Sequence, residues 1–277
     1  MPNLAKTRIL ITRYIKKLIN EFISDGTMML ASSIAYYFLF SIFPLMLILI
    51  SFTGFIIDTL NIQTTILDFI QERIPIIYNF TESNIENTIQ NRRSIGIIGI
   101  VFLLVATTYV FDSVQYALNK IYSTESQRKF WQQKAFGILI ISMVFVLILL
   151  SFLSSTVLFY LAQTIFDLIN ITENISQTLI KALSLVVSLA FNFSIFCLIY
   201  FFGTNRRINF KNIYKGALFG AAGWEITKHI FLIYLNQFAN FELTYGSVGS
   251  IIGFLLWVYI SSLILLIGAQ INSLSLK

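Results

Sequence analysis

Three ionisable residues lie close together in a long apolar stretch near the C-terminal end of the chain. Glu225, Lys228 and His229 follow one another at i, i+3 and i+4 spacing, so they share one face of a helix. Such groups cost about 3 kcal/mol each at mid-membrane unless they pair or meet water, so they mark a candidate functional site. Glu225 could accept a proton or a cation, Lys228 could balance it or bind an anion, and His229 could change charge near neutral pH. A structural ion pair is the alternative interpretation.

Further polar side chains interrupt other apolar stretches. Asp112 and Asn192 each lie inside one, and Tyr36 and Tyr37 form a pair inside another. We predict that these four residues join Glu225, Lys228 and His229 in an intramembrane polar site or pathway. For the tyrosine pair, ordinary helix packing is the alternative. Asn192 also follows Ser188 at i, i+4 spacing, a pattern typical of hydrogen bonds between membrane helices.

The residues needed for catalysis are sparse. His229 is the only histidine and Cys197 the only cysteine, and the chain contains no Gly-rich phosphate loop. Metal-dependent hydrolysis needs clustered carboxylates or histidines. We therefore expect no catalytic residues, no metal site and no cofactor. Basic loops would touch RNA only weakly and without sequence preference, so no nucleic-acid partner is expected.

The composition explains where these residues must sit. Of the 277 residues, 57% are hydrophobic and 12% are charged, about half the charged share of a soluble domain. Several apolar runs exceed the roughly 20 residues that cross a bilayer. We predict an all-α integral membrane protein, a six-helix bundle forming one domain over 27–277, with spans near 27–57, 95–118, 136–162, 179–203, 213–237 and 246–273.

Residues 1–26 precede the first predicted span and have a different pattern. They predict an amphipathic helix with an apolar face (Ile11, Tyr14, Ile15, Leu18, Phe22) and basic residues largely opposite (Arg13, Lys16, Lys17). This pattern suits the cytoplasmic lipid surface, so membrane lipids are expected partners. A solvated helix docked on neighbouring loops is the alternative.

The basic residues predict the orientation. Fourteen Lys and Arg residues fall on the side of both termini and four on the other side. By the positive-inside rule, both termini are cytoplasmic and the polar loop 58–94 is extracytoplasmic. We expect a multi-pass protein of the bacterial cytoplasmic (inner) membrane.

Small residues and one proline predict how the helices pack. Gly216 with Gly220, and Gly249 with Gly253, have the spacing that lets membrane helices approach closely. Pro44 removes a backbone hydrogen bond, so a kink is expected there, with nearby Ser hydroxyls satisfying the freed carbonyl.

Two segments resemble a known family. The first is ASSIAYYFLFSIFPLML, which contains Tyr36, Tyr37 and Pro44. The second is TYGSVGSIIGFLLWVYISSLILLIGAQIN, near the C-terminus. Together with the order and number of apolar segments across nearly the whole chain, they resemble the YihY/BrkB family of bacterial inner-membrane proteins. The family usually has Gly-Ala-Glu where this chain has Gly268-Ala269-Gln270, so a carboxylate role at position 270 is in doubt.

The resemblance implies a six-span membrane protein of poorly defined activity, in a family that once carried a ribonuclease label. Polar residues inside several spans favour a transporter or flippase for a lipid or other amphiphile. A non-catalytic membrane scaffold or envelope assembly factor is the alternative. Neither interpretation identifies the substrate, the coupling ion or the oligomeric state.

Overall fold

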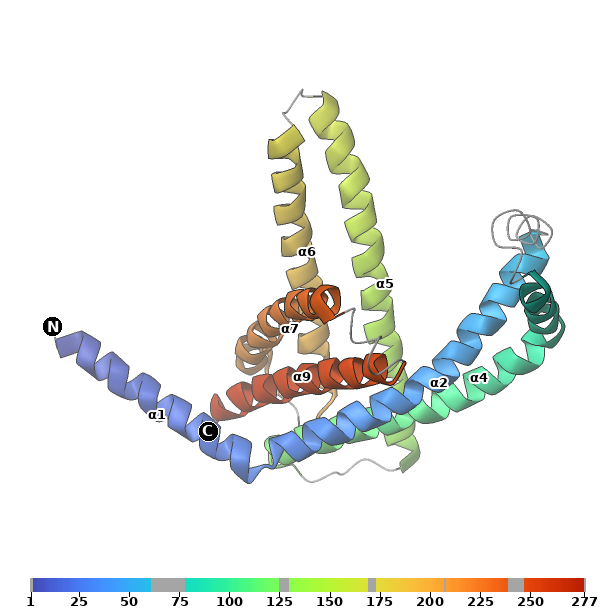
Figure 1. The fold of residues 1–277 in the computed structure, drawn as a ribbon. Helices are drawn as coiled ribbons and strands as arrows, with labels where there is room; N and C mark the ends of the chain where they lie inside the picture. Colours follow the sequence, from blue (N-terminus) through green and yellow to red (C-terminus); the bar gives the residue numbers. More distant parts are fainter. Residues whose placement is uncertain are drawn as a thin grey trace. The chain divides into compact units, whose positions relative to one another are not determined.

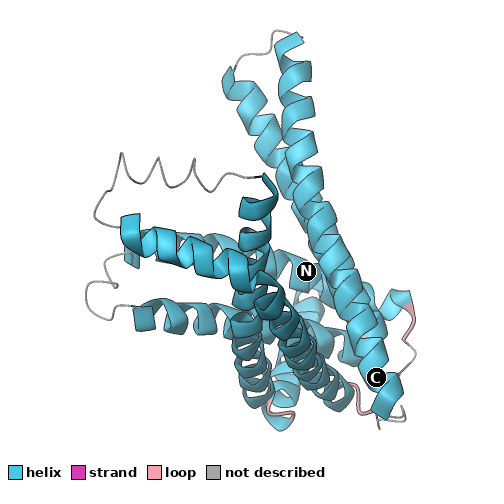
Figure 2. Ribbon diagram, turned by 90° about the vertical axis from the view of Figure 1, so that its right-hand side faces the viewer, coloured by secondary structure: helices cyan, strands magenta, loops and turns pink. Residues whose placement is uncertain are grey.

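The architecture is seen in a computed structural model that describes residues 2–60, 78–124, 130–168, 173–206, 208–238 and 247–276. In these ranges the chain forms helices and short turns but no strand, which confirms the predicted all-α class (Figure 2). The helices are α1 (Pro2–Ser24), α2 (Thr27–Leu60), α4 (Tyr78–Ile121), α5 (Phe130–Leu168), α6 (Glu173–Phe202), α7 (Phe210–Phe238) and α9 (Ser247–Leu274) (Figure 1).

Five segments within the described ranges are long and apolar enough to cross a membrane: Thr27–Phe55, Arg93–Ile121, Gln133–Ser151, Thr178–Phe202 and Ile251–Leu274. They agree with five of the predicted spans. The predicted span near 213–237 corresponds to α7, which is not among the five. Glu225, Lys228 and His229 lower the hydropathy of α7, and the count of six spans therefore stays a prediction.

The segment predicted as the loop 58–94 differs from the expectation. Helix α2 continues to Leu60 and α4 already begins at Tyr78, so residues 78–94 are helical; residues 61–77 lie outside the described ranges. The local sequence is polar yet contains few helix breakers, so it extends the helix beyond the apolar span. The side of the membrane on which it lies remains a prediction.

The chain divides into two compact units. The second unit, residues 37–110, pairs the later part of α2 with the earlier part of α4. Two glycines of α4 permit a close approach there. A Cβ added at Gly99 would lie 3.0 Å from Cγ1 of Ile48 and 3.1 Å from Cβ of Leu47, and one added at Gly96 would lie 3.2 Å from Cβ of Ser51. Tyr37 and Tyr109 stack with ring centroids 5.7 Å apart. The unit is thus held by backbone-level packing and ring stacking.

Pro44 lies inside α2, where the helix continues through it. The neighbouring Ser41 hydroxyl donates a 2.6 Å hydrogen bond to the carbonyl of Phe38. The sequence predicts a Ser hydroxyl at the carbonyl of Phe40, because Pro44 has no N–H to donate to it. Ser41 therefore serves a different carbonyl of the same turn, and the kink itself stays a prediction.

The first unit, residues 1–36 and 111–277, contains the main core. In its centre α7 packs on both α6 and α9 (Figure 1). Of the five candidate spans α9 is the most buried, with 33% of its apolar window buried against 6% to 17% in the others. Gly253 of this helix is buried, whereas the prediction for Gly249 falls on a residue whose burial the structure does not describe. Helix α9 is therefore the most deeply packed of the five candidate spans.

A buried polar network ties the end of α4 to the segment after α6. The side-chain oxygen of Asn119 accepts hydrogen bonds from the Thr204 hydroxyl at 3.1 Å and from the Asn205 amide at 2.9 Å. The Gln115 amide donates to the side-chain oxygen of Asn205 at 3.1 Å. Tyr122 is buried beside this network, and burial raises the pKa of its phenol, so it stays neutral.

We expect Asn119→Ala to lower the free energy of unfolding by about 1 to 3 kcal/mol, because two donors around Asn119 lose their acceptor. Denaturant titration in mixed micelles would measure the loss. Asn20→Ala is a matched control, since the side chain of Asn20 is exposed within α1. Equal stability of the two variants would contradict a supporting role for the network.

Candidate functional site at the contact of α6 and α7

The site lies where two helix faces of complementary shape meet. On α7, Ala217 and Ala221 are fully buried, and a Cβ added at Gly220 would lie 2.6 Å from the ring of Phe196 on α6. Glu225 lies one turn beyond Ala221 at the same i, i+4 spacing. The small residues that bring α6 and α7 together therefore also carry the Glu225 carboxylate into the contact.

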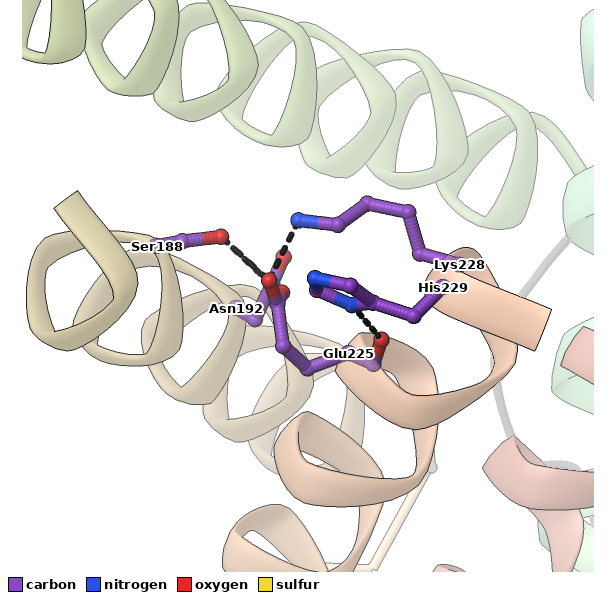
Figure 3. Close-up of polar contacts among 5 residues, drawn as sticks. All are labelled: Ser188, Asn192, Glu225, Lys228 and His229. Atoms are coloured by element: carbon purple, nitrogen blue, oxygen red, sulfur yellow. Dashed lines mark hydrogen bonds and ion pairs between the residues drawn. The ribbon is translucent and has the colours of Figure 1, made fainter. Parts of the chain in front are cut away.

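The carboxylate of Glu225 is the centre of a polar cluster (Figure 3). Its Oε2 accepts hydrogen bonds from the Ser188 hydroxyl at 3.0 Å and from Nδ2 of Asn192 at 3.3 Å. Its Oε1 pairs with the ammonium of Lys228. Only 7% of Glu225 is exposed. We call Ser188, Asn192, Glu225, Lys228 and His229 the Glu225 cluster.

Lys228 and His229 form the open side of the Glu225 cluster. The Lys228 side chain is 39% exposed, whereas that of Glu225 is 9% exposed. Nδ1 of His229 contacts the backbone carbonyl oxygen of Glu225 at 2.8 Å, and the His229 side chain is exposed. This contact fixes the ring through Nδ1 and leaves Nε2 on the outer side of the imidazole. The cluster thus combines a buried anion with two more accessible basic groups.

Aromatic packing against α9 fixes α7 on another side. The Trp224 and Trp257 rings lie 5.3 Å apart, and Phe231 stacks on Trp257 at 5.4 Å. Trp224 directly precedes Glu225 in the chain. These ring contacts limit rotation of α7, which keeps the Glu225 carboxylate directed at α6.

The arrangement stabilises an ionised carboxylate. An ionised carboxylate accepts hydrogen bonds only, and each of the three side chains around Glu225 supplies a donor. The buried charge of Glu225 depends strongly on the ammonium of Lys228, because an unpaired buried ion is costly. The cluster is therefore a buried anion with one partly exposed counter-ion.

Asp112 is in a different place. Its carboxylate pairs with Lys134 at the start of α5, and Nε2 of Gln133 donates to it at 3.2 Å. Both charged side chains are partly buried: 28% of the Asp112 side chain and 21% of the Lys134 side chain are exposed. The pair joins α4 to α5 and has no member in common with the Glu225 cluster.

The tyrosine pair is divided between the two units. Tyr36 is 54% exposed at the end of the part of α2 that belongs to the first unit. Tyr37 belongs to the second unit, where it stacks on Tyr109. Of the seven predicted site residues, the structure gathers Asn192, Glu225, Lys228 and His229. Within the described ranges, no three His, Cys, Asp or Glu side chains group as potential metal ligands.

Comparison with known proteins gives the family. Residues 18–276 match the family model described as Virulence factor BrkB. The chain belongs to the BrkB family. This confirms the resemblance to the YihY/BrkB family that was indicated by two motifs, one near each end of the chain. No solved structure matches the chain.

Several curated BrkB relatives are similar over most of the chain. The chain is 27% identical to the putative ribonuclease-like protein YfkH of Bacillus subtilis over 94% of each protein. It is 27% identical to a UPF0761 membrane protein of Pelodictyon phaeoclathratiforme over 90% of this chain and 57% of that protein. A UPF0761 membrane protein of Chromohalobacter salexigens is 26% identical over 98% of this chain and 65% of its own length. The chain thus spans little more than half of several longer relatives, and the shared part is a membrane protein.

Some contacts in this BrkB protein were not predicted from the sequence. Ser188 was noted in a helix-packing ladder, yet its hydroxyl contacts Glu225 directly. Gln270 is fully buried, and its amide donates to Thr27 Oγ1 at 2.8 Å and to Asp25 Oδ2 at 3.3 Å. Position 270, where the family pattern has Glu, therefore links α9 to the α1–α2 junction. In the sequence, the available signal was a polar residue inside an otherwise apolar motif.

Proposed function

We propose that this membrane protein moves a lipid or another amphiphile across the bilayer, and that the Glu225 cluster binds its polar headgroup. We place it in the bacterial cytoplasmic membrane with both termini inside, following its basic residues. The observation that carries the proposal is the buried carboxylate of Glu225, held at the α6–α7 contact by Lys228, Ser188 and Asn192. Ionisable groups in such positions line substrate or ion routes in many membrane proteins.

The charges suggest how binding and release are coupled. With Glu225 ionised, Lys228 is its counter-ion. The ammonium of Lys228 is partly exposed, so it can turn from Glu225 to an anionic headgroup. The α6 side of the cluster offers only the neutral Ser188 and Asn192. His229, exposed next to Lys228, can add a hydrogen bond to the same headgroup. Return of the ammonium to Glu225 would release the ligand.

The surroundings fit a ligand with an apolar tail. Ile226 and Ile230 flank the cluster on α7, and each is 60% exposed. Leu185 on α6, one turn before Ser188, is 44% exposed. In a bilayer these side chains face acyl chains, so a headgroup could reach Lys228 while its tail stays in lipid. This arrangement favours an amphiphile over a small hydrophilic solute.

Reconstitution of the full chain in liposomes tests the proposal. Fluorescent phospholipids with anionic, zwitterionic and cationic headgroups would be placed in one leaflet, and their arrival in the other followed by chemical quenching. We expect anionic lipids to move faster than in protein-free liposomes, and faster than the zwitterionic and cationic lipids. If no amphiphile in the panel moves, the proposal is wrong and a scaffold role takes its place.

A further inference from the structure

The surface of α1 is divided into three strips. Leu18 and Phe22 are half-buried, and α1 contacts α9. Ile15, Ile19 and Ile23 lie on the next strip at i, i+4 and i+8, and they are 49%, 51% and 70% exposed. The remaining strip carries the exposed basic residues Arg13, Lys16 and Lys17. The strip of three isoleucines is apolar, continuous and borders the basic strip.

The C-terminal end of α1 is fixed to one end of the bundle. The α1–α2 junction turns at Gly26, whose φ is +65°, a conformation that glycine adopts without strain. Gln270 near the end of α9 donates hydrogen bonds to Asp25 and Thr27 on either side of this turn. The Ser273 hydroxyl donates at 3.0 Å to the carbonyl of Ile121, the last residue of α4. The ends of α1, α4 and α9 therefore lie at one level.

Residues typical of the headgroup region occur at that end of the bundle. Exposed aromatic residues lie at the end of α4 and the starts of α5 and α7, with exposed lysines near them: Tyr116, Trp131, Phe210, Tyr214, Lys120, Lys211 and Lys215. Amphipathic aromatic side chains and lysines concentrate where lipid headgroups meet the acyl chains. Helix α1 therefore leaves the bundle at the level of the headgroups.

We infer that α1 lies on the anionic lipid surface of the protein's own membrane, with Ile15, Ile19 and Ile23 inserted among the acyl chains. The neighbouring Arg13, Lys16 and Lys17 then contact acidic headgroups. Charge complementarity selects this occupant: a basic strip beside an apolar one matches an anionic bilayer. The link at Gln270 keeps α1 close to the bilayer, which raises the effective concentration of lipid around it.

The test uses the full chain in nanodiscs with one fluorescent label. Cys197, the only cysteine, is replaced in a Cys197→Ser background. An environment-sensitive probe is then attached through Ile19→Cys, or through Asn20→Cys as a matched control on the neighbouring basic side. In nanodiscs that contain phosphatidylglycerol, we expect the probe at position 19 to shift to the blue and to be quenched by nitroxide-labelled lipids. The probe at position 20 should respond much less.

The lipid charge and the basic strip give the decisive comparisons. In nanodiscs of phosphatidylcholine alone the quenching at position 19 should fall. In phosphatidylglycerol, each of Lys16→Gln and Lys17→Gln should lower the docked-to-undocked ratio about fivefold. Equal quenching in the two lipids, or a water-exposed probe in both, overturns the inference. A probe at position 19 that shifts to the blue but is not quenched by the nitroxide-labelled lipids also overturns it, because a protein surface, such as a second copy of the chain, would then cover the strip.

Discussion

Replacement of Lys228 by methionine is expected to destabilise the protein more than any other single change in the Glu225 cluster. Methionine keeps the apolar part of the side chain but leaves the Glu225 carboxylate, 7% exposed, without a counter-ion. Removing one partner of a buried pair typically costs about 3 to 5 kcal/mol. The lower end applies here, because the Lys228 side chain is 39% exposed. Denaturant titration in mixed micelles would measure the change.

A second variant separates lost charge balance from lost packing. In the double variant Glu225→Gln/Lys228→Met the buried charge is absent, and Gln keeps an oxygen that accepts from Ser188 and Asn192. We expect the double variant to regain most of the lost stability. Glu225→Gln alone should be mild, since the ammonium of Lys228 can turn to water or headgroups. A double variant as unstable as Lys228→Met would contradict the ion-pair account.

A side chain at Gly216 is expected to disrupt the contact of α7 with α9. A Cβ at this position would meet the backbone carbonyl oxygen of Gly268 and would lie 2.6 Å from Cγ of Asn272. The amide of Gly216 also donates a 2.8 Å hydrogen bond to Oδ1 of Asn272, so α7 cannot shift without losing it. Overpacking of this kind costs about 1 to 3 kcal/mol for small changes, and Gly216→Leu should exceed that range.

Another glycine of α7 is the matched control for Gly216. A Cβ at Gly223 would lie 2.9 Å from Cγ2 of Ile264, a side-chain methyl group that can move. We expect Gly223→Ala to be tolerated, and Gly216→Ala to lower the thermal stability in detergent despite the better helix propensity of alanine. If the two alanine variants melt at the same temperature, the close backbone contact of α7 with α9 is not limiting.

The helices and the polar faces could be predicted from the sequence because both follow from short-range periodicity. Apolar runs of spanning length predicted all five candidate spans of the described ranges. The i, i+3, i+4 spacing placed Glu225, Lys228 and His229 together. The spacing of Gly216 and Gly220 predicted close packing, and both glycines indeed contact neighbouring helices. These properties depend on one segment at a time.

Partners across helices could not be predicted in this way. Nothing in the spacing of residues pairs Asp112 with Lys134 rather than with the Glu225 cluster, because that choice depends on which helices are neighbours. The same applies to Asn119, whose partners lie in the segment after α6. Gln270 contacts residues at the opposite end of the chain. A single sequence contains no direct record of such long-range contacts.

The most direct test of the central claim compares two carboxylates in the liposome transport assay. Glu225 and Asp112 each pair with a lysine, yet only Glu225 belongs to the site that we propose for the headgroup. At matched amounts of reconstituted protein, Glu225→Gln should abolish the protein-dependent movement of anionic lipid, whereas Asp112→Asn should retain it. Unchanged transport by Glu225→Gln would contradict the account, as would an equal loss in the two variants.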